Sequence, residues 1–154
     1  MKVNPPLIRF AAIHDYETVS RLVQQVQTLH IELRPDIYKS CDPVLAEEEF
    51  LHDLRTSLVA ETDGTVVGFL SYTVRHIETP FQVTRDVLYI DTLVVEEAAR
   101  GQGIGRALLD RLRRIAAEGA YDGIELQVNA RNLQARKMYE AYGFTEKSIN
   151  MELL

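Results

Sequence analysis

A cluster of three glycines between two arginines is the part of the sequence best suited to bind a ligand. Gly101, Gly103 and Gly105 lie between Arg100 and Arg106, just before apolar residues at helical spacing. Glycine allows positive φ and leaves no Cβ in the way of a ligand. A helix that begins here presents unpaired backbone N–H groups and the positive end of its dipole, which attract phosphate. The segment predicts an anion site to which both arginines can add charge-assisted hydrogen bonds.

Two common nucleotide-binding motifs do not match this segment. A P-loop requires Gly-x-x-x-x-Gly-Lys-Ser/Thr, and the chain has neither that spacing nor the lysine. The dinucleotide fingerprint Gly-x-Gly-x-x-Gly needs a glycine where Arg106 stands, and Glu125, a possible ribose-binding acid, falls inside a predicted strand. A nicotinamide dinucleotide is therefore only a third alternative. The plain alternative is that the glycines form a tight turn beside solvated arginines.

The hydrophobic pattern predicts an α/β protein in which helices flank a mixed sheet, with a parallel pair of strands around the glycine segment. Strands are predicted at 7–13, 57–61, 65–77, 87–95, 123–128 and from 144 onward. Helices are predicted from Asp15 to about Arg34, from Asp42 through Leu54, from Ile104, and from Asn132 to Gly143. Asp63-Gly64 predicts a tight hairpin, and the 87–95 strand, apolar at most positions, is expected to be central.

Length and composition limit the function classes. A chain of 154 residues with 46% hydrophobic content is expected to form a single domain over residues 1–154. The net charge of -6 argues against a general nucleic-acid binder. Cys41 is the single cysteine, the four histidines share no metal-ligand spacing, and no apolar run is typical of a signal peptide or membrane span. We therefore expect a cytoplasmic protein that binds no metal, membrane or nucleic acid.

Two motifs together make the chain resemble the GCN5-related N-acetyltransferase (GNAT) family over nearly its whole length. The family's pyrophosphate motif, Arg/Gln-x-x-Gly-x-Gly/Ala, is matched between a strand and a helix by Arg100, Gly103 and Gly105. A second motif, Asn-x-x-Ala-x-x-x-Tyr-x-x-x-Gly-Phe, is matched at every position by Asn132, Ala135, Tyr139, Gly143 and Phe144.

This resemblance implies an acyl-CoA-dependent N-acyltransferase that passes an acetyl group from acetyl-CoA to a primary amine, by direct attack in a ternary complex. It also implies a GNAT-like, mostly antiparallel sheet whose central parallel strands splay apart. Backbone groups on the central strand would then pair with pantetheine, and the glycine segment would hold the pyrophosphate. The cofactor-binding residues implied are Leu93, Val94, Val95, Arg100, Gly101, Gln102, Gly103, Ile104, Gly105, Arg106, Asn132, Ala135 and Tyr139.

The reaction requires a base and an acid. An aliphatic amine has a pKa of about 10.4 and must lose a proton before it attacks. The resemblance points to Asp91 as the base, with pairing to a cation as the alternative role; Asp86, Glu125 and Glu78 are weaker candidates. It points to Tyr139 as the acid that protonates the departing thiolate, with a core aromatic as the alternative. A backbone N–H near Val94 can stabilise the developing oxyanion.

The acceptor is a small-molecule or peptide amine whose identity the sequence leaves open. Residues 42–53 hold five acids and no Lys or Arg, which would steer a cationic acceptor, although such runs are usually solvated helix faces. Tyr38 and His76 are substrate-contact candidates on position alone. The alternative function is a non-catalytic acyl-CoA sensor on the same fold. A homodimer is possible because terminal strands offer sheet edges.

Overall fold

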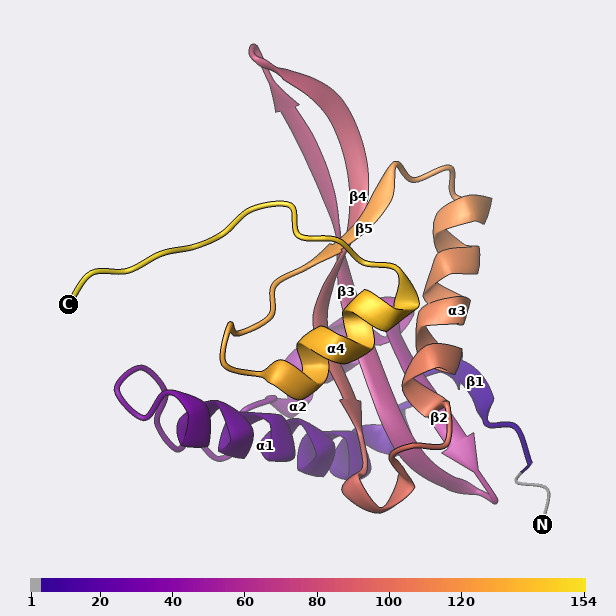
Figure 1. The fold of residues 1–154 in the computed structure, drawn as a ribbon. Helices are drawn as coiled ribbons and strands as arrows, with labels where there is room; N and C mark the ends of the chain where they lie inside the picture. The colour runs from indigo at the N-terminus through magenta and orange to yellow at the C-terminus, as the bar shows by residue number, and fades with distance from the viewer. Residues whose placement is uncertain (1–3) are drawn as a thin grey trace.

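A computed structural model of the chain describes residues 4–154 as one five-stranded sheet covered by helices on both faces (Figure 1). The strands, in their order across the sheet, are β1 (Leu7–Phe10), β2 (Ser57–Thr62), β3 (Thr65–Thr79), β4 (Gln82–Val95) and β5 (Gly123–Leu126). The helices are α1 (Tyr16–Leu33), α2 (Glu47–His52), α3 (Ile104–Glu118) and α4 (Leu133–Tyr142). The first four strands are antiparallel and β4 pairs with β5 in parallel, so the predicted mixed sheet is confirmed.

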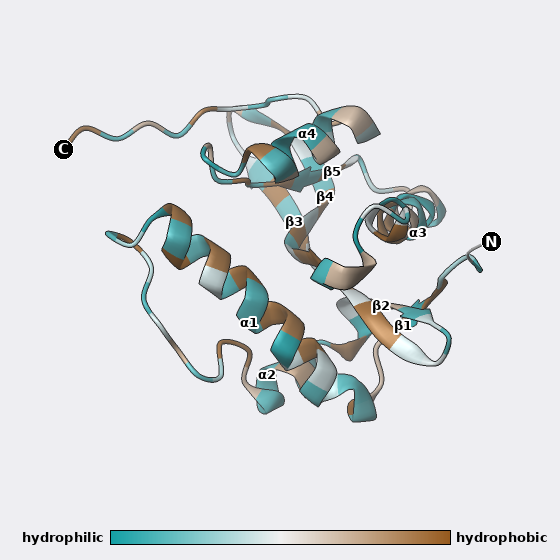
Figure 2. Cartoon of the chain, turned by 60° about the horizontal axis from the view of Figure 1, so that its bottom comes forward, coloured by the Kyte–Doolittle hydropathy of each residue, from teal (hydrophilic) through white to brown (hydrophobic). Residues whose placement is uncertain are grey.

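The sheet separates two hydrophobic cores, one beneath α3 and one beneath α1 and α2. In Figure 2, α3 is seen nearly end-on at one side of the strands and α1 lies at the other. Leu108 and Leu112 of α3 pack on Leu58, Leu70 and Leu88 of the sheet. The opposite core is built from Val19, Leu22, Phe50, Val59 and Phe69. Because every one of these side chains is almost fully buried, the sheet is a rigid platform for what lies at its edge.

Gly68 in β3 allows α3 to approach the sheet closely. A Cβ added there would lie 3.0 Å from Ile104 Cγ2 and 3.2 Å from both Leu108 Cδ1 and Ala60 Cβ. A Gly68→Val variant is therefore expected to lose about 1–3 kcal/mol of the free energy of unfolding through overpacking, measured by urea denaturation. Thr65→Val, at an exposed position of the same strand, should change it by less than about 0.5 kcal/mol. Equal stabilities of the two variants would contradict this packing argument.

A β-bulge interrupts β4 at Asp91. Ile90 pairs with Tyr72 and Thr92 pairs with Ser71, so Asp91 is an extra residue with no partner opposite it. The bulge changes which side chains face which core. Before it, Leu88 and Ile90 belong to the core beneath α3, and after it, Leu93 and Val95 contact that core.

The central parallel strands splay apart beyond the bulge. β5 ends at Leu126, opposite Ile90, whereas β4 continues to Val95. Within residues 4–154, no strand pairs with the β5-facing edge of β4 after Ile90. The predicted splay is confirmed, and it leaves backbone groups of β4 available to a ligand.

Three local predictions are wrong. The second helix does not start at Asp42 but at Glu47, because the preceding segment packs irregularly against α1, where Tyr16 Oη donates to Leu45 O at 2.8 Å. Asp15 precedes α1 without capping it through its side chain, since its carboxylate accepts from Arg9 Nη1 at 2.7 Å instead. The strand predicted from Phe144 onward is absent from the described chain, where these residues are extended but unpaired.

Candidate functional site

The glycine segment forms a turn that leads directly into α3, as its spacing predicts. Gly101 has φ 79° and Gly103 has φ 78°, a conformation that residues with a side chain rarely adopt. A Cβ added at either glycine would meet no atom within 4 Å. The space on the outer side of this turn is therefore open, and a ligand there could contact the backbone of the two glycines.

The same turn carries a row of unpaired donors. The first amide of α3 with a helical acceptor is that of Ala107, which donates to Gly103 O at 3.0 Å. The N–H groups of residues 101–106 have no hydrogen-bond acceptor among the residues that the structure describes. Such a row at the positive end of a 15-residue helix suits a pyrophosphate, so the residues present fit coenzyme A.

The two arginines beside the turn are both exposed. Arg100 Nε donates to Val95 O at 3.1 Å, which ties the turn to the end of β4. The guanidinium of Arg106 lies 5.7 Å from the centre of the Tyr142 ring. Their predicted contact with phosphate stays a prediction.

The end of β4 and the start of α4 contribute the other predicted cofactor contacts. Leu93 and Val95 are half-buried and Val94 is buried, so their backbone edge, not their side chains, is what a ligand can reach. Asn132 Oδ1 accepts from Ala135 N at 3.1 Å, which confirms the predicted helix cap.

Tyr139 lies on α4 with a half-buried ring. The ring packs edge-on against Phe144, with centroids 5.5 Å apart. Burial raises the pKa of Tyr139 to about 12, so its hydroxyl is protonated at neutral pH. That hydroxyl makes no hydrogen bond to any residue that the structure describes. Tyr139 is therefore equipped to donate a proton.

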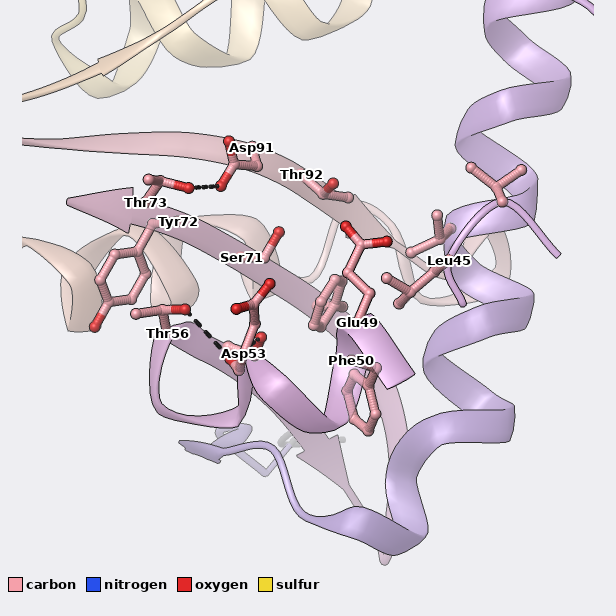
Figure 3. Close-up of a pocket in the computed structure, with 14 residues that line it drawn as sticks. Leu45, Glu49, Phe50, Asp53, Thr56, Ser71, Tyr72, Thr73, Asp91 and Thr92 are labelled. Carbon is pink, nitrogen blue, oxygen red and sulfur yellow. Dashed lines mark hydrogen bonds between the residues drawn. The ribbon is translucent and has the colours of Figure 1, made fainter. Parts of the chain in front are cut away.

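Asp91 is exposed at the bulge of β4, and a neighbouring hydroxyl orients it. Thr73 Oγ1 donates to Asp91 Oδ2 at 2.6 Å, an interaction drawn in Figure 3. Its weaker competitors are engaged elsewhere: Glu125 pairs with Lys147 at 2.7 Å, and Asp86 contacts His76 Nδ1 at 2.6 Å. Asp91 is the carboxylate of this group that borders a pocket.

The pocket of about 340 Å³ lies between α2 and strands β3 and β4. Figure 3 shows the carboxylates of Glu49 and Asp53 pointing into it from α2 and the turn that follows, across from Asp91. Its lining includes no Lys, Arg or His. The rest of the wall is mixed: apolar side chains, among them Val23, Leu45 and Phe50, lie beside the hydroxyl groups of Ser, Thr and Tyr residues. The pocket therefore combines negative charge with apolar surface.

Sequence reasoning identified the acidic run but not which acids face the pocket. Glu47 and Glu48 are exposed outside it, whereas Glu49 lines it one position further along α2. Helical spacing distinguishes the acids that face the pocket from those that do not. Glu49 and Asp53 are four residues apart, so both side chains lie on the same side of α2 and the residue that follows it.

The structure brings neither tentative substrate residue to this pocket. Tyr38 packs on His30, with ring centroids 4.8 Å apart. His76 lies far along β3, where hydrogen bonds to Glu78 and then Asp86 raise its pKa. Their role in acceptor binding stays a prediction.

Residues 4–154 contain no group of three or more His, Cys, Asp or Glu side chains arranged to hold a metal ion. None of the helices described is long and apolar enough to cross a membrane.

Comparison with known proteins gives matches in sequence and in structure. The model of the acetyltransferase (GNAT) family matches residues 23–144. A mycothiol acetyltransferase of Beutenbergia cavernae is 38% identical over 63 residues, which make up 41% of this chain and 21% of that protein. The chain spans between 21% and 39% of the length of the curated relatives it matches.

Solved structures match over nearly the whole chain. The crystal structure of a mutant of the BH1408 protein from Bacillus halodurans has a TM-score of 0.93 and 30% identity, over 96% of this chain and 98% of that one. The aminoglycoside N-acetyltransferase AAC(6′)-Iy, solved in complex with CoA, has a TM-score of 0.71 and 19% identity, over 96% and 98%. At that identity, the second match speaks for a shared fold alone.

Proposed function

The chain belongs to the acetyltransferase (GNAT) family, and from this premise we propose that it transfers an acetyl group from acetyl-CoA to the primary amine of a cationic acceptor, by direct attack in a ternary complex. One observation carries the proposal. β4 connects the two parts of the site. The row of unpaired backbone donors follows the end of β4, and the carboxylate-lined pocket borders β4 at Asp91. Asp91 and Val95 are four residues apart, or about 13 Å along an extended strand.

The donor substrate would occupy the splay and the glycine turn. N–H groups of residues 101–106 would bind the pyrophosphate, with Arg100 and Arg106 adding charge. The free edge of Leu93 to Val95 and the Asn132 side chain would contact the pantetheine arm. Bound acetyl-CoA would supply an acetyl group activated as a thioester.

The protein's own side chains would manage the protons. Asp91, oriented by Thr73, would accept the proton of the acceptor ammonium, directly or through water. A backbone N–H near Val94, on the β4 edge that faces away from β3, would donate to the oxygen that gains charge during attack. Tyr139, whose pKa is raised by burial, would give its proton to the departing sulfur.

The pocket supports a cationic acceptor. Glu49, Asp53 and Asp91 offer three carboxylates, and the lining itself holds no Lys, Arg or His, although Asp53 Oδ1 also lies 2.7 Å from His52 Nδ1 outside it. Such a site favours a substrate with a second positive charge in addition to the reacting amine. Walls that combine apolar side chains with Ser, Thr and Tyr hydroxyls suit a spacer of methylene groups or a sugar ring between the two charges.

The test is release of free CoA thiol from acetyl-CoA in the presence of an amine panel of spermidine, amino sugars, amino acids and peptides. We expect turnover, with the highest kcat/KM for amines that carry a second positive charge. Glu49→Gln and Asp53→Asn should each raise the KM for such amines about tenfold, because a charge-assisted contact is lost.

Glu48→Gln is the matched control, since Glu48 is on the same helix but outside the pocket lining, and it should leave KM unchanged. Thiol release with every amine class at equal efficiency would refute the cationic preference. No release with any amine, together with tight CoA binding, would favour the alternative of a non-catalytic acyl-CoA sensor.

A further inference from the structure

The sheet face that carries Asp91 continues from the pocket onto a two-stranded arm. β3 and β4 stay paired past the first residue of β5, as far as Thr79 and Gln82, and project beyond the rest of the sheet (Figure 1). Tyr89 lies opposite Thr73 in this ladder, and Thr73 Oγ1 donates to Asp91, so the three side chains share one face. A molecule bound at Asp91 therefore has this face of the arm as its neighbour.

An arginine lies on the same face, against Tyr89. Arg75 is two residues beyond Thr73 along β3, so their side chains point to the same side of the sheet. The guanidinium carbon of Arg75 lies 3.3 Å from the centre of the Tyr89 ring, a cation–π contact that orients the group. Arg75 is exposed and makes no hydrogen bond or ion pair with any residue that the structure describes. Its N–H donors are therefore available to a ligand.

Two other cations near this face are already paired. Arg85, further out on the arm, lies 3.1 Å from Glu125 Oε2, and Lys147 Nζ lies 2.7 Å from Glu125 Oε1. One carboxylate thus occupies both of them, and Arg75 has no such partner in the described chain. A planar guanidinium matches a carboxylate through two parallel hydrogen bonds, so Arg75 is suited to bind an anionic group of a ligand.

Arg75 lies just outside the rim of the pocket. The lining includes Phe69, Ser71 and Thr73 from one face of β3, and the next side chain on that face is Arg75. Two residues along a strand span about 7 Å, which is within the reach of an arginine side chain. Thr73, which orients Asp91, therefore lies between the acidic pocket and a free cation.

We propose that the acceptor is a free basic α-amino acid, such as lysine, ornithine or arginine. Its side-chain cation enters the acidic pocket, its α-amine reacts beside Asp91, and its α-carboxylate binds Arg75. This inference rests on the proposed acetyl transfer and names its acceptor class. The order of charges on the protein matches such a molecule, because the α-amine and α-carboxylate share one carbon and the side chain leads away from it.

The transfer joins the α-nitrogen to the acetyl carbon as the carbon–sulfur bond of the thioester breaks. The α-ammonium gives up two protons in this step. One leaves to solvent through Asp91, and the other ends on the CoA thiol through Tyr139, which donates to the sulfur and is then reprotonated. The products are an Nα-acetyl amino acid, free CoA and one proton.

Arg75 disfavours other acceptors that carry the same cations. A polyamine that extends past Asp91 brings an ammonium group toward the Arg75 guanidinium, and like charges repel. A peptide has no carboxylate next to its reacting N-terminal amine. A basic amino acid alone among these compounds supplies a cation, an amine and an adjacent carboxylate.

Lysine and cadaverine form a matched pair of ligands, because they differ only by the α-carboxylate. Calorimetric titration of the protein–CoA complex should show lysine binding about tenfold or more tightly than cadaverine, since a charge-assisted contact is gained. Arg75→Gln should weaken lysine binding to the level of cadaverine and leave cadaverine binding unchanged. Arg85→Gln is the matched control, because Arg85 is already paired with Glu125, and it should keep the preference for lysine.

Three results would overturn the inference: equal affinity of the wild-type protein for both ligands, a preference that survives Arg75→Gln, or a preference that Arg85→Gln also removes. Thiol release with acetyl-CoA distinguishes this outcome from failure of the proposed function. Binding of lysine that depends on Arg75, without thiol release, would refute acetyl transfer and support carboxylate recognition. Where thiol is released, mass spectrometry should identify Nα-acetyl-lysine, and an Nε-acetyl product would contradict the proposed orientation.

Discussion

A Gly103→Leu variant is expected to lose CoA affinity by about 100-fold or more while it keeps the wild-type fold, because two or more charge-assisted hydrogen bonds to phosphate are blocked. Gly103 has φ 78°, and an added Cβ would meet no atom within 4 Å, so the leucine side chain would start in open space. Calorimetric titration with CoA measures the loss, and circular dichroism reports the fold.

Gly64→Leu separates blocked binding from backbone strain. Gly64 has φ 79° in the hairpin turn between β2 and β3, and a Cβ there also meets nothing within 4 Å. Both variants therefore carry a similar strain, of order 1–3 kcal/mol, but Gly64 lies in the β2–β3 hairpin and contributes none of the free N–H donors of residues 101–106, so its replacement should leave CoA affinity unchanged. Wild-type affinity in Gly103→Leu would show that the turn before α3 does not bind the pyrophosphate.

Replacing Tyr139 with Phe is expected to lower kcat by about 100-fold at unchanged CoA affinity, since it removes only the hydroxyl that we propose as proton donor. The phenyl ring keeps its packing on Phe144, and the lost hydroxyl has no hydrogen-bond partner within residues 4–154. Burial raises the pKa of Tyr139 to about 12, and a phenol is protonated below its pKa. The wild-type protein therefore keeps this hydroxyl protonated at neutral pH, and the kcat loss should be present throughout the neutral range.

Tyr142→Phe serves as the matched control on the same helix. The Tyr142 hydroxyl donates to Asp110 Oδ1 at 2.7 Å and is already engaged in a structural contact. Its loss should leave kcat unchanged and at most lower stability by about 1 kcal/mol. If both variants turn over like the wild-type enzyme, Tyr139 is only a packing residue and another group protonates the sulfur.

The elements that sequence reasoning predicted correctly depend on contacts between close neighbours in the chain. Asn132 caps α4 through an amide three residues away, and Asp63-Gly64 closes a two-residue turn with both residues at positive φ. The turn around Gly103 likewise follows from the glycines themselves. Each of these caps and turns is determined by a few neighbouring residues, so it can be predicted without knowing the rest of the fold.

The features that it missed depend on partners far away in the chain. The segment after Asp42 is shaped by contacts with α1, and its Leu45 carbonyl accepts from a tyrosine 29 residues earlier. Apolar and polar residues do alternate after Phe144, but a strand also needs a neighbour to pair with, and within residues 4–154 no strand pairs with this segment. The bulge at Asp91 appears only when β4 is paired with β3, because one strand alone has no register.

That bulge also affects how the protein can vary over evolutionary time. Point substitution at Asp91 changes one carboxylate at the pocket and leaves the strand pairing intact. Deleting the residue would remove the bulge and keep every other pairing, because Ile90 and Thr92 already lie opposite the neighbouring residues Tyr72 and Ser71. The residues of β4 after the bulge would keep their faces, so either change at position 91 should remove the carboxylate from the pocket without disturbing the two cores.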